Sequence, residues 1–135
     1  RSQMAEGIAL SLAPSGVRVS SAGSLPAAIR PEAVAVLNEI NIDISAHRSK
    51  GIGEIDQETV DAVITLCAEE VCPVFTRPVS RLHWGLADPA SARGGEQKRL
   101  DAFRRTRDEL YRRLARLFSH QYMRPETNQA GKPDE

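Results

Sequence analysis

One run of apolar residues constrains the fold of this chain more than any other feature. Residues 62 to 66 read Ala-Val-Ile-Thr-Leu, which is nearly continuous in apolar and β-branched side chains. A strand with one face in water would instead alternate apolar and polar residues. The run therefore predicts a strand that is covered on both faces, as in a parallel α/β sheet. Cys67 ends this strand.

Three stretches of helical periodicity surround that strand. Residues 2 to 12 carry apolar side chains four apart, which predicts an amphipathic helix. Pro31 suits the first turn of a second helix. A long third helix is expected from about Gln97 to Ser119, with arginines on one side. The apolar positions on its other side are Leu100, Phe103, Leu110, Leu114 and Leu117.

Two further strands complete the pattern. Val17 and Val19 alternate with polar residues, which predicts a short strand that stops at Gly23, and residues 81 to 84 predict another, stopped by Gly85. The order helix, strand, helix, strand, strand, helix is a doubly wound pattern that lacks its opening strand. The expected fold is α/β, an open parallel sheet with helices on both faces.

The length and composition limit the class of protein. A chain of 135 residues predicts one domain, here residues 1–119, followed by a polar tail over residues 120–135. Its 18 basic residues balance 18 acidic ones, which argues against a nucleic-acid or anionic-membrane surface as its main role. Without a membrane-length apolar run, a signal-peptide pattern or a disulfide-scaffold cysteine count, the expected location is cytoplasmic.

The first two residues are candidates for anion binding. Arg1 and Ser2 stand at the start of the first helix. In α/β folds, backbone N–H groups and the helix dipole favour an oxyanion at the turn from strand to helix. A guanidinium there can hold two oxygens of a tetrahedral anion. The alternative is an ordinary solvated arginine.

The two cysteines, Cys67 and Cys72, are separated by four residues. One helical turn or an open loop between them can bring the sulfurs within disulfide distance. The alternative is a pair of small buried apolar side chains. A zinc site is not expected, because two sulfurs without a second pair fall short of four ligands.

Asp88 immediately precedes Pro89. The proline pushes Asp88 away from helical geometry and can hold its carboxyl at the mouth of a site as a general acid. The alternative is an aspartate that caps a turn. His83 is expected to pack rather than react, as is Trp84, and His47 is expected at the surface.

Several blocks of the sequence together resemble one family. The blocks, in chain order, are RSQMAEG, SSAGSLPA, INIDISAHRSK, AVITLCAEEVCP and HWGLADPASARGGEQKRLDAFRRTRDEL. They are similar to blocks of the thiol-dependent arsenate reductases, which have the three-layer fold of low-molecular-weight protein tyrosine phosphatases. The resemblance runs from Arg1 to about Phe118.

The resemblance gives Arg1 and Ser2 specific roles. The family's anion loop is a cysteine, five residues, then an arginine and a serine, directly after the first strand. Arg1 matches that arginine, and Ser2 matches the serine that hydrogen-bonds the catalytic thiolate. We therefore expect the first strand, the nucleophilic cysteine and most of the loop to be absent from this chain. The chain alone is expected to show no turnover.

The resemblance also implies a mechanism. The family's nucleophilic cysteine would attack arsenate held by Arg1, and Asp88 would protonate the departing oxygen. Cys67 would then attack the cysteine–arsenic adduct and release arsenite, and Cys72 would resolve the resulting disulfide. Thioredoxin or another thiol donor would reduce the Cys67–Cys72 bond, with no prosthetic group and no metal. Thioredoxin-coupled members separate these cysteines by six residues, so the spacing of four here favours altered recycling.

Two other functions stay open. A low-molecular-weight protein tyrosine phosphatase commonly has an aromatic residue after Asp-Pro, whereas Ala90 stands here. A non-catalytic binding or regulatory module would keep the fold without the nucleophile. In the phosphatase fold the first strand lies in the middle of the sheet, so its absence would separate the Val17 strand from the Ala62 strand.

Overall fold

The computed structural model describes residues 1–23, 28–68 and 78–119. Cys72 and the expected polar tail over residues 120–135 lie outside these ranges. Within them, no helix is both long and apolar enough to span a lipid bilayer.

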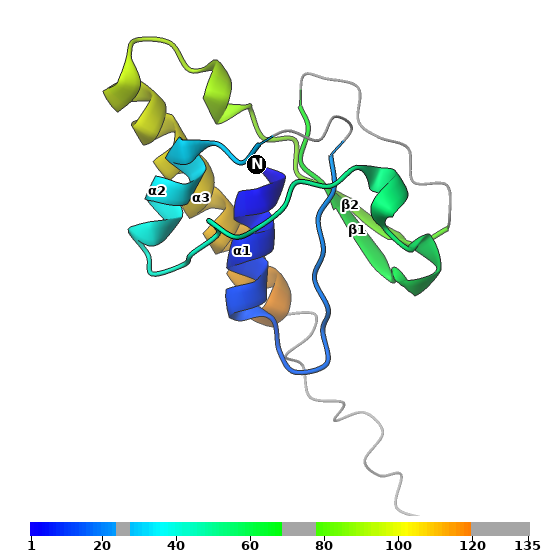
Figure 1. Ribbon diagram of the computed structural model, residues 1–135. Helices are drawn as coiled ribbons and strands as arrows, with labels where there is room; N and C mark the ends of the chain where they lie inside the picture. The colour runs from blue at the N-terminus through cyan, green and yellow to red at the C-terminus, as the bar shows by residue number, and fades with distance from the viewer. Residues whose placement is uncertain (24–27, 69–77, 120–135) are drawn as a thin grey trace, which may run out of the picture.

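Three α-helices form where the periodicity predicts them (Figure 1). Helix α1 spans Ser2–Leu12, helix α2 spans Pro31–Asn38 with its proline in the first turn, and helix α3 spans Glu96–Leu117. The described residues also contain the short 3₁₀ segments η1 (Ile52–Glu54), η2 (Gln57–Thr59) and η3 (Pro89–Ser91). The predicted bounds of α1 and the predicted start of α2 at Pro31 are confirmed.

The described strands form a parallel pair. Strand β1 (Ala62–Thr65) lies beside β2 (Ser80–His83), and Thr65 is directly opposite His83. Two backbone bonds extend the pairing beyond the strands. The N–H of Trp84 donates to the carbonyl of Thr65 at 2.8 Å, and the N–H of Leu86 donates to that of Leu66 at 2.9 Å. The expected parallel α/β arrangement is confirmed.

Two expectations about the strands are wrong within the described residues. Residues 17–22 form no strand, and only an isolated parallel bridge joins Gly23 to Gly51. Val17 and Val19 do pack against the core, but alternation alone cannot form a strand whose backbone meets no neighbouring strand. The run at β1 is also not covered on both faces, because Ala62 is exposed and the other β1 residues are half-buried.

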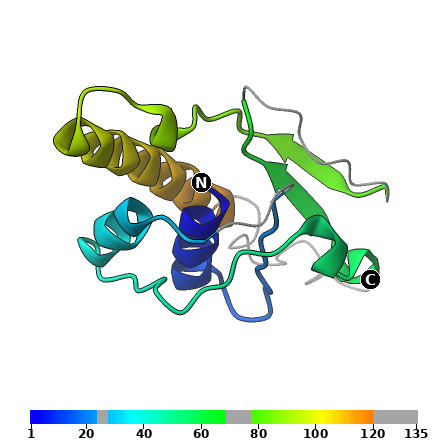
Figure 2. The ribbon, with the colours of Figure 1, turned by 45° about the horizontal axis from the view of Figure 1, so that its top comes forward.

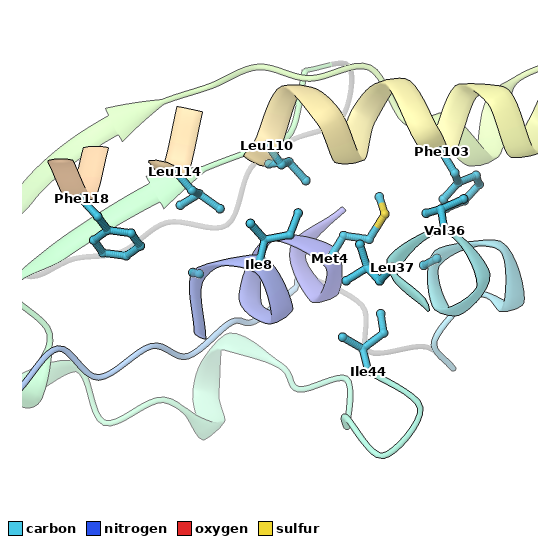
Figure 3. Packing of buried hydrophobic residues seen from close by; sticks show 11 residues of the cluster. Met4, Ile8, Val36, Leu37, Ile44, Phe103, Leu110, Leu114 and Phe118 are labelled. Atoms are coloured by element: carbon cyan, nitrogen blue, oxygen red, sulfur yellow. The ribbon is translucent and has the colours of Figure 1, made fainter. Parts of the chain in front are cut away.

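The main core lies between the helices (Figure 3). Met4 and Ile8 of α1 point toward the side chains of α3, and Val36 and Leu37 of α2 close one end of the cluster. The other buried members are Ala9, Ala33, Ile44, Phe103, Leu110, Leu114 and Phe118.

Close contact between α1 and its neighbours requires a glycine at position 7. A Cβ atom there would lie 2.5 Å from Cγ2 of Ile44 and 3.1 Å from Cδ1 of Leu37. The missing side chain therefore lets α1 approach the loop that follows α2.

Ion pairs join α2 to α3 at the surface. Glu39, just after α2, accepts hydrogen bonds from Arg104 at 2.8 Å and from Arg107 at 2.7 Å. Arg107 also donates to the carbonyl of Val36 at 2.9 Å. The hydrogen bond from Arg104, followed in size by the one from Arg107, lowers the pKa of Glu39 to about 2.

Candidate functional site

Arg1 is held against the segment that follows β2. Its guanidinium Nη1 donates to the carbonyl oxygen of Leu86 at 2.7 Å, although 85 positions separate the two residues. Arg1 is also the N-cap of α1, and its carbonyl accepts the N–H of Ala5. The start of α1 and the carboxyl end of the sheet therefore meet.

The same segment leads to Cys67. The N–H of Leu86 donates to the carbonyl of Leu66, the residue before Cys67. A single residue thus binds the Arg1 guanidinium through its carbonyl and the end of β1 through its N–H. Arg1 and Cys67 lie at the same edge of the sheet, which is where ligand sites form in open parallel sheets.

Asp88 lies two residues beyond Leu86, in the geometry of a helix cap. It is the N-cap of η3, with φ −71° and ψ 113°, and its Oδ1 accepts the N–H of Ala90 at 3.0 Å. Pro89 occupies the first turn and is buried. The capping alternative is therefore realised, two residues after the carbonyl that binds Arg1.

Cys67 is disulfide-bonded. This residue comes two positions after the end of the half-buried strand β1 and is itself half-buried. Cys72 lies outside the described residues, so the Cys67–Cys72 pairing stays a prediction. Ser2 is the first residue of α1, where free backbone N–H groups collect.

A polar cluster behind the start of α1 was not anticipated from the sequence. Gln3 is only 9% exposed, and its Nε2 donates to Ser21 Oγ at 3.2 Å and to the Arg48 carbonyl at 3.3 Å. Ser21 in turn donates to Glu6 at 2.8 Å. The only sequence signal was a glutamine among apolar residues on the buried face of an amphipathic helix.

Two histidines differ from expectation. His47 was expected at the surface, but its side chain is 23% exposed and its Nδ1 lies 3.8 Å from Glu6, which also pairs with Lys50 at 3.6 Å. His83 was expected to pack, but it is exposed, and its Nδ1 lies 2.5 Å from the hydroxyl of Thr65. In both cases long-range neighbours, which a local pattern does not contain, determine the environment.

Trp84 packs as predicted. It lies against the core, and the guanidinium carbon of Arg113 in α3 stands 5.8 Å from the centre of its ring.

Comparisons with known proteins place these features in a family context. The model of the family described as low molecular weight phosphotyrosine protein phosphatase matches residues 1–128. An arsenate reductase from Halalkalibacterium halodurans is 40% identical over 116 residues, which cover 84% of each chain. An arsenate reductase from Bacillus licheniformis is 42% identical over 119 residues, covering 87% of this chain and 86% of the relative.

Solved structures agree with this likeness. A structure described as an arsenate reductase in the phosphate binding state has a TM-score of 0.70 and 31% identity, and 87% of each chain is covered. Another, described as an arsenate reductase in oxidized state, has a TM-score of 0.71 and 31% identity, with 87% of this chain and 86% of that one covered.

Proposed function

Since the chain belongs to the low molecular weight phosphotyrosine protein phosphatase family, we propose that it is an enzyme that reduces arsenate to arsenite in arsenic detoxification. One observation carries the proposal beyond the names of its relatives. Leu86 binds the Arg1 guanidinium through its carbonyl and the end of β1 through its N–H. Arg1, Cys67 and Asp88 thus come from segments that meet at one edge of the sheet, which supports this proposal.

Arg1 and Ser2 bind the oxyanion in this proposal. The Leu86 carbonyl orients the planar guanidinium, which suits the paired oxygens of arsenate. The first N–H groups of α1 have no partner within the helix, so they and the helix dipole add to the attraction for an anion at this helix start. Arsenate and phosphate are both tetrahedral anions of this kind, so phosphate is expected to compete.

The chemistry then passes through thiols. In the family, a cysteine before the matched arginine attacks arsenate and forms a sulfur–arsenic bond; the cysteines of this chain are Cys67 and Cys72. Asp88 gives a proton to the departing oxygen. Cys67 attacks the sulfur of that adduct, and the electron pair of the sulfur–arsenic bond stays on arsenic, which leaves as arsenite. Cys72 then resolves the disulfide.

The reductant is an external thiol donor such as thioredoxin, and no prosthetic group is needed because the sulfurs carry both electrons. This requirement favours a reducing compartment, so we place the enzyme in the cytoplasm. The spacing of four residues between the cysteines favours a recycling step that differs from that of relatives with six.

The test measures arsenate-dependent oxidation of NADPH by the protein, coupled through thioredoxin and its reductase. We expect turnover that Cys67→Ser abolishes and that Asp88→Asn lowers by about 100-fold, the usual contribution of a positioned proton donor.

The same preparations are assayed for hydrolysis of p-nitrophenyl phosphate, because a phosphatase is the competing function. Hydrolysis that survives Cys67→Ser, without arsenate-dependent oxidation, would establish the phosphatase alternative. Neither activity, with arsenate binding retained, would favour the non-catalytic module.

A further inference from the structure

The two strands have one face toward the helical core and one face away from it. Ile64, Leu66 and Trp84 pack against the core. Because side chains alternate along a strand, Thr65 and His83 project from the opposite face. The mechanism proposed above uses neither of these two residues.

Thr65 and His83 are directly opposite each other in the parallel register. Their side chains share a hydrogen bond, with Thr65 Oγ1 at 2.5 Å from His83 Nδ1. The bond orients the ring and occupies Nδ1. The second ring nitrogen, Nε2, is then the one positioned to exchange a proton with another group.

That nitrogen is turned toward the end of β1. A Cβ atom placed on Gly85 would lie 3.1 Å from His83 Nε2, and 3.7 Å from both the carbonyl oxygen of Cys67 and the Cβ of Ala68. The ring and the Cys67–Ala68 segment therefore border the same small space. Cys67 also follows Thr65 by two residues, the spacing that puts side chains on one face of an extended chain.

From this arrangement we propose that His83 manages the proton on the Cys67 sulfur during disulfide exchange. The inference rests on the proposed function, because it requires Cys67 to alternate between disulfide and thiol. Cys67 is disulfide-bonded in the structure. An imidazole nitrogen can both donate and accept a proton, so it can serve both directions of the exchange.

The proton and electron balance of the reduction is simple. A thiolate of an external dithiol attacks the sulfur bonded to Cys67, the sulfur–sulfur bond breaks, and its electron pair departs on Cys67 Sγ. His83 Nε2 supplies the proton. The second thiol of the dithiol then displaces the protein's other sulfur, so two electrons reach the protein disulfide, and the products are two protein thiols and an oxidised dithiol. The imidazole regains its proton from solvent, and disulfide formation runs this transfer in reverse.

The control variant is chosen from the other charged residues at this edge of the sheet. In the described residues they are Arg81, two positions before His83 on the same strand face, together with Arg1 and Asp88; Thr65, which faces the ring from β1, is uncharged. Arg81→Gln removes a positive charge from that face and keeps the imidazole. His83→Gln removes the titratable ring and keeps a side chain that can hydrogen-bond to Thr65.

The experiment follows reduction of the Cys67 disulfide by dithiothreitol, without arsenate, between about pH 5.5 and pH 8.5. Samples are quenched in acid, alkylated and weighed by mass spectrometry. At the acid end we expect wild type to be reduced about tenfold faster than His83→Gln, with the ratio falling to about one at the alkaline end, where the departing thiolate needs no proton. This is less than the usual effect of a proton donor, because a thiolate leaves readily.

The ratio isolates the histidine, because ionisation of dithiothreitol affects every variant equally. A ratio that is constant with pH would reveal a merely structural role and overturn the proposal. The same profile in Arg81→Gln would overturn it too, since local charge would then suffice. If the pH-dependent ratio is found while the protein fails to reduce arsenate, the proposed function is wrong and the role of His83 in disulfide exchange stands.

Discussion

The helical half of the molecule and its sheet half are built differently (Figure 2). The helical half, made of α1, α2 and α3, contains side chains with almost no exposure, such as Met4 at 0% and Phe103 at 1%. The sheet half, made of β1, β2 and the segment through Asp88, has one half-buried strand and one strand exposed along its whole length. Leu82 in β2 is 39% exposed.

The difference has a physical cause and a functional consequence. A helix satisfies its backbone hydrogen bonds internally, so three helices need only bury their apolar faces against one another. A strand depends on neighbouring strands for the same bonds. We infer that the helical half supplies most of the stability, while the sheet edge leaves His83 exposed and Cys67 and Asp88 half-buried. Arg1 joins the two halves through Leu86.

The largest expected effect comes from emptying the helical core. Phe103→Ala removes a ring that is 1% exposed, and such truncations cost about 3 to 5 kcal/mol of unfolding free energy. Leu82→Ala is the matched change in the sheet half and is expected to cost less than about 1 kcal/mol, because that side chain is already partly in water. Urea denaturation followed by far-ultraviolet circular dichroism measures both. Equal losses would show that the two halves contribute equally to stability.

A smaller effect is expected from adding one methyl group to α1. Alanine is the better helix former by about 1 kcal/mol, yet Gly7→Ala would place Cβ 2.5 Å from a carbon of the buried Ile44. We expect a net loss of about 1 to 3 kcal/mol in the same denaturation assay.

Gly53→Ala is the control for that change, because nothing lies within 4 Å of a Cβ built there. It is expected to leave stability within about 0.5 kcal/mol of wild type. If Gly7→Ala instead stabilised the protein, the helical half would be packed more loosely than its structure indicates.

Removing the contact between Arg113 of α3 and Trp84, which joins the two halves, is expected to have a still smaller effect on the free energy of unfolding. Arg113 lies 5.8 Å from the ring centre of Trp84 and also pairs with Glu109. Arg112 pairs with the same glutamate. Arg113→Gln is therefore expected to cost about 0.5 to 1 kcal/mol more than Arg112→Gln, the value of a partly exposed cation–π contact. Equal unfolding free energies for the two variants would mean that this contact adds nothing across the junction.

The smallest effect is expected at the α2–α3 surface, where it shows as a pH dependence. The hydrogen bonds from Arg104 and Arg107 lower the pKa of Glu39 from 4.5 to about 2. Its stabilising contribution is therefore fully present above pH 4.5 and is lost as the pH falls toward 2. The difference in unfolding free energy between wild type and Glu39→Gln should shrink over that interval and should also shrink in high salt. A difference that is constant from pH 5 to pH 2 would contradict the assignment.

The sequence predicted what depends on near neighbours. Apolar residues four apart located α1, and Pro31 located the start of α2. The β-branched run located β1. The sequence did not reveal that the alternating residues 17–22 would lack a strand partner, because pairing depends on a segment distant in the chain. The environment of His47 was missed for the same reason, since Glu6 lies far from it in sequence.

The amino-acid order by itself therefore determined the helices, the parallel pair and the family, because these follow from periodicity, turn residues and blocks of adjacent residues. Only the tertiary structure decided how the candidate site is assembled. Leu86 joins Arg1 to the end of β1, and Thr65 orients His83 beside the segment that contains Cys67. Such contacts form between residues far apart along the chain. Pairing of β1 with β2 places Thr65 opposite His83 and Leu86 beside Leu66, and packing of α1 against the end of the sheet brings Arg1 to Leu86.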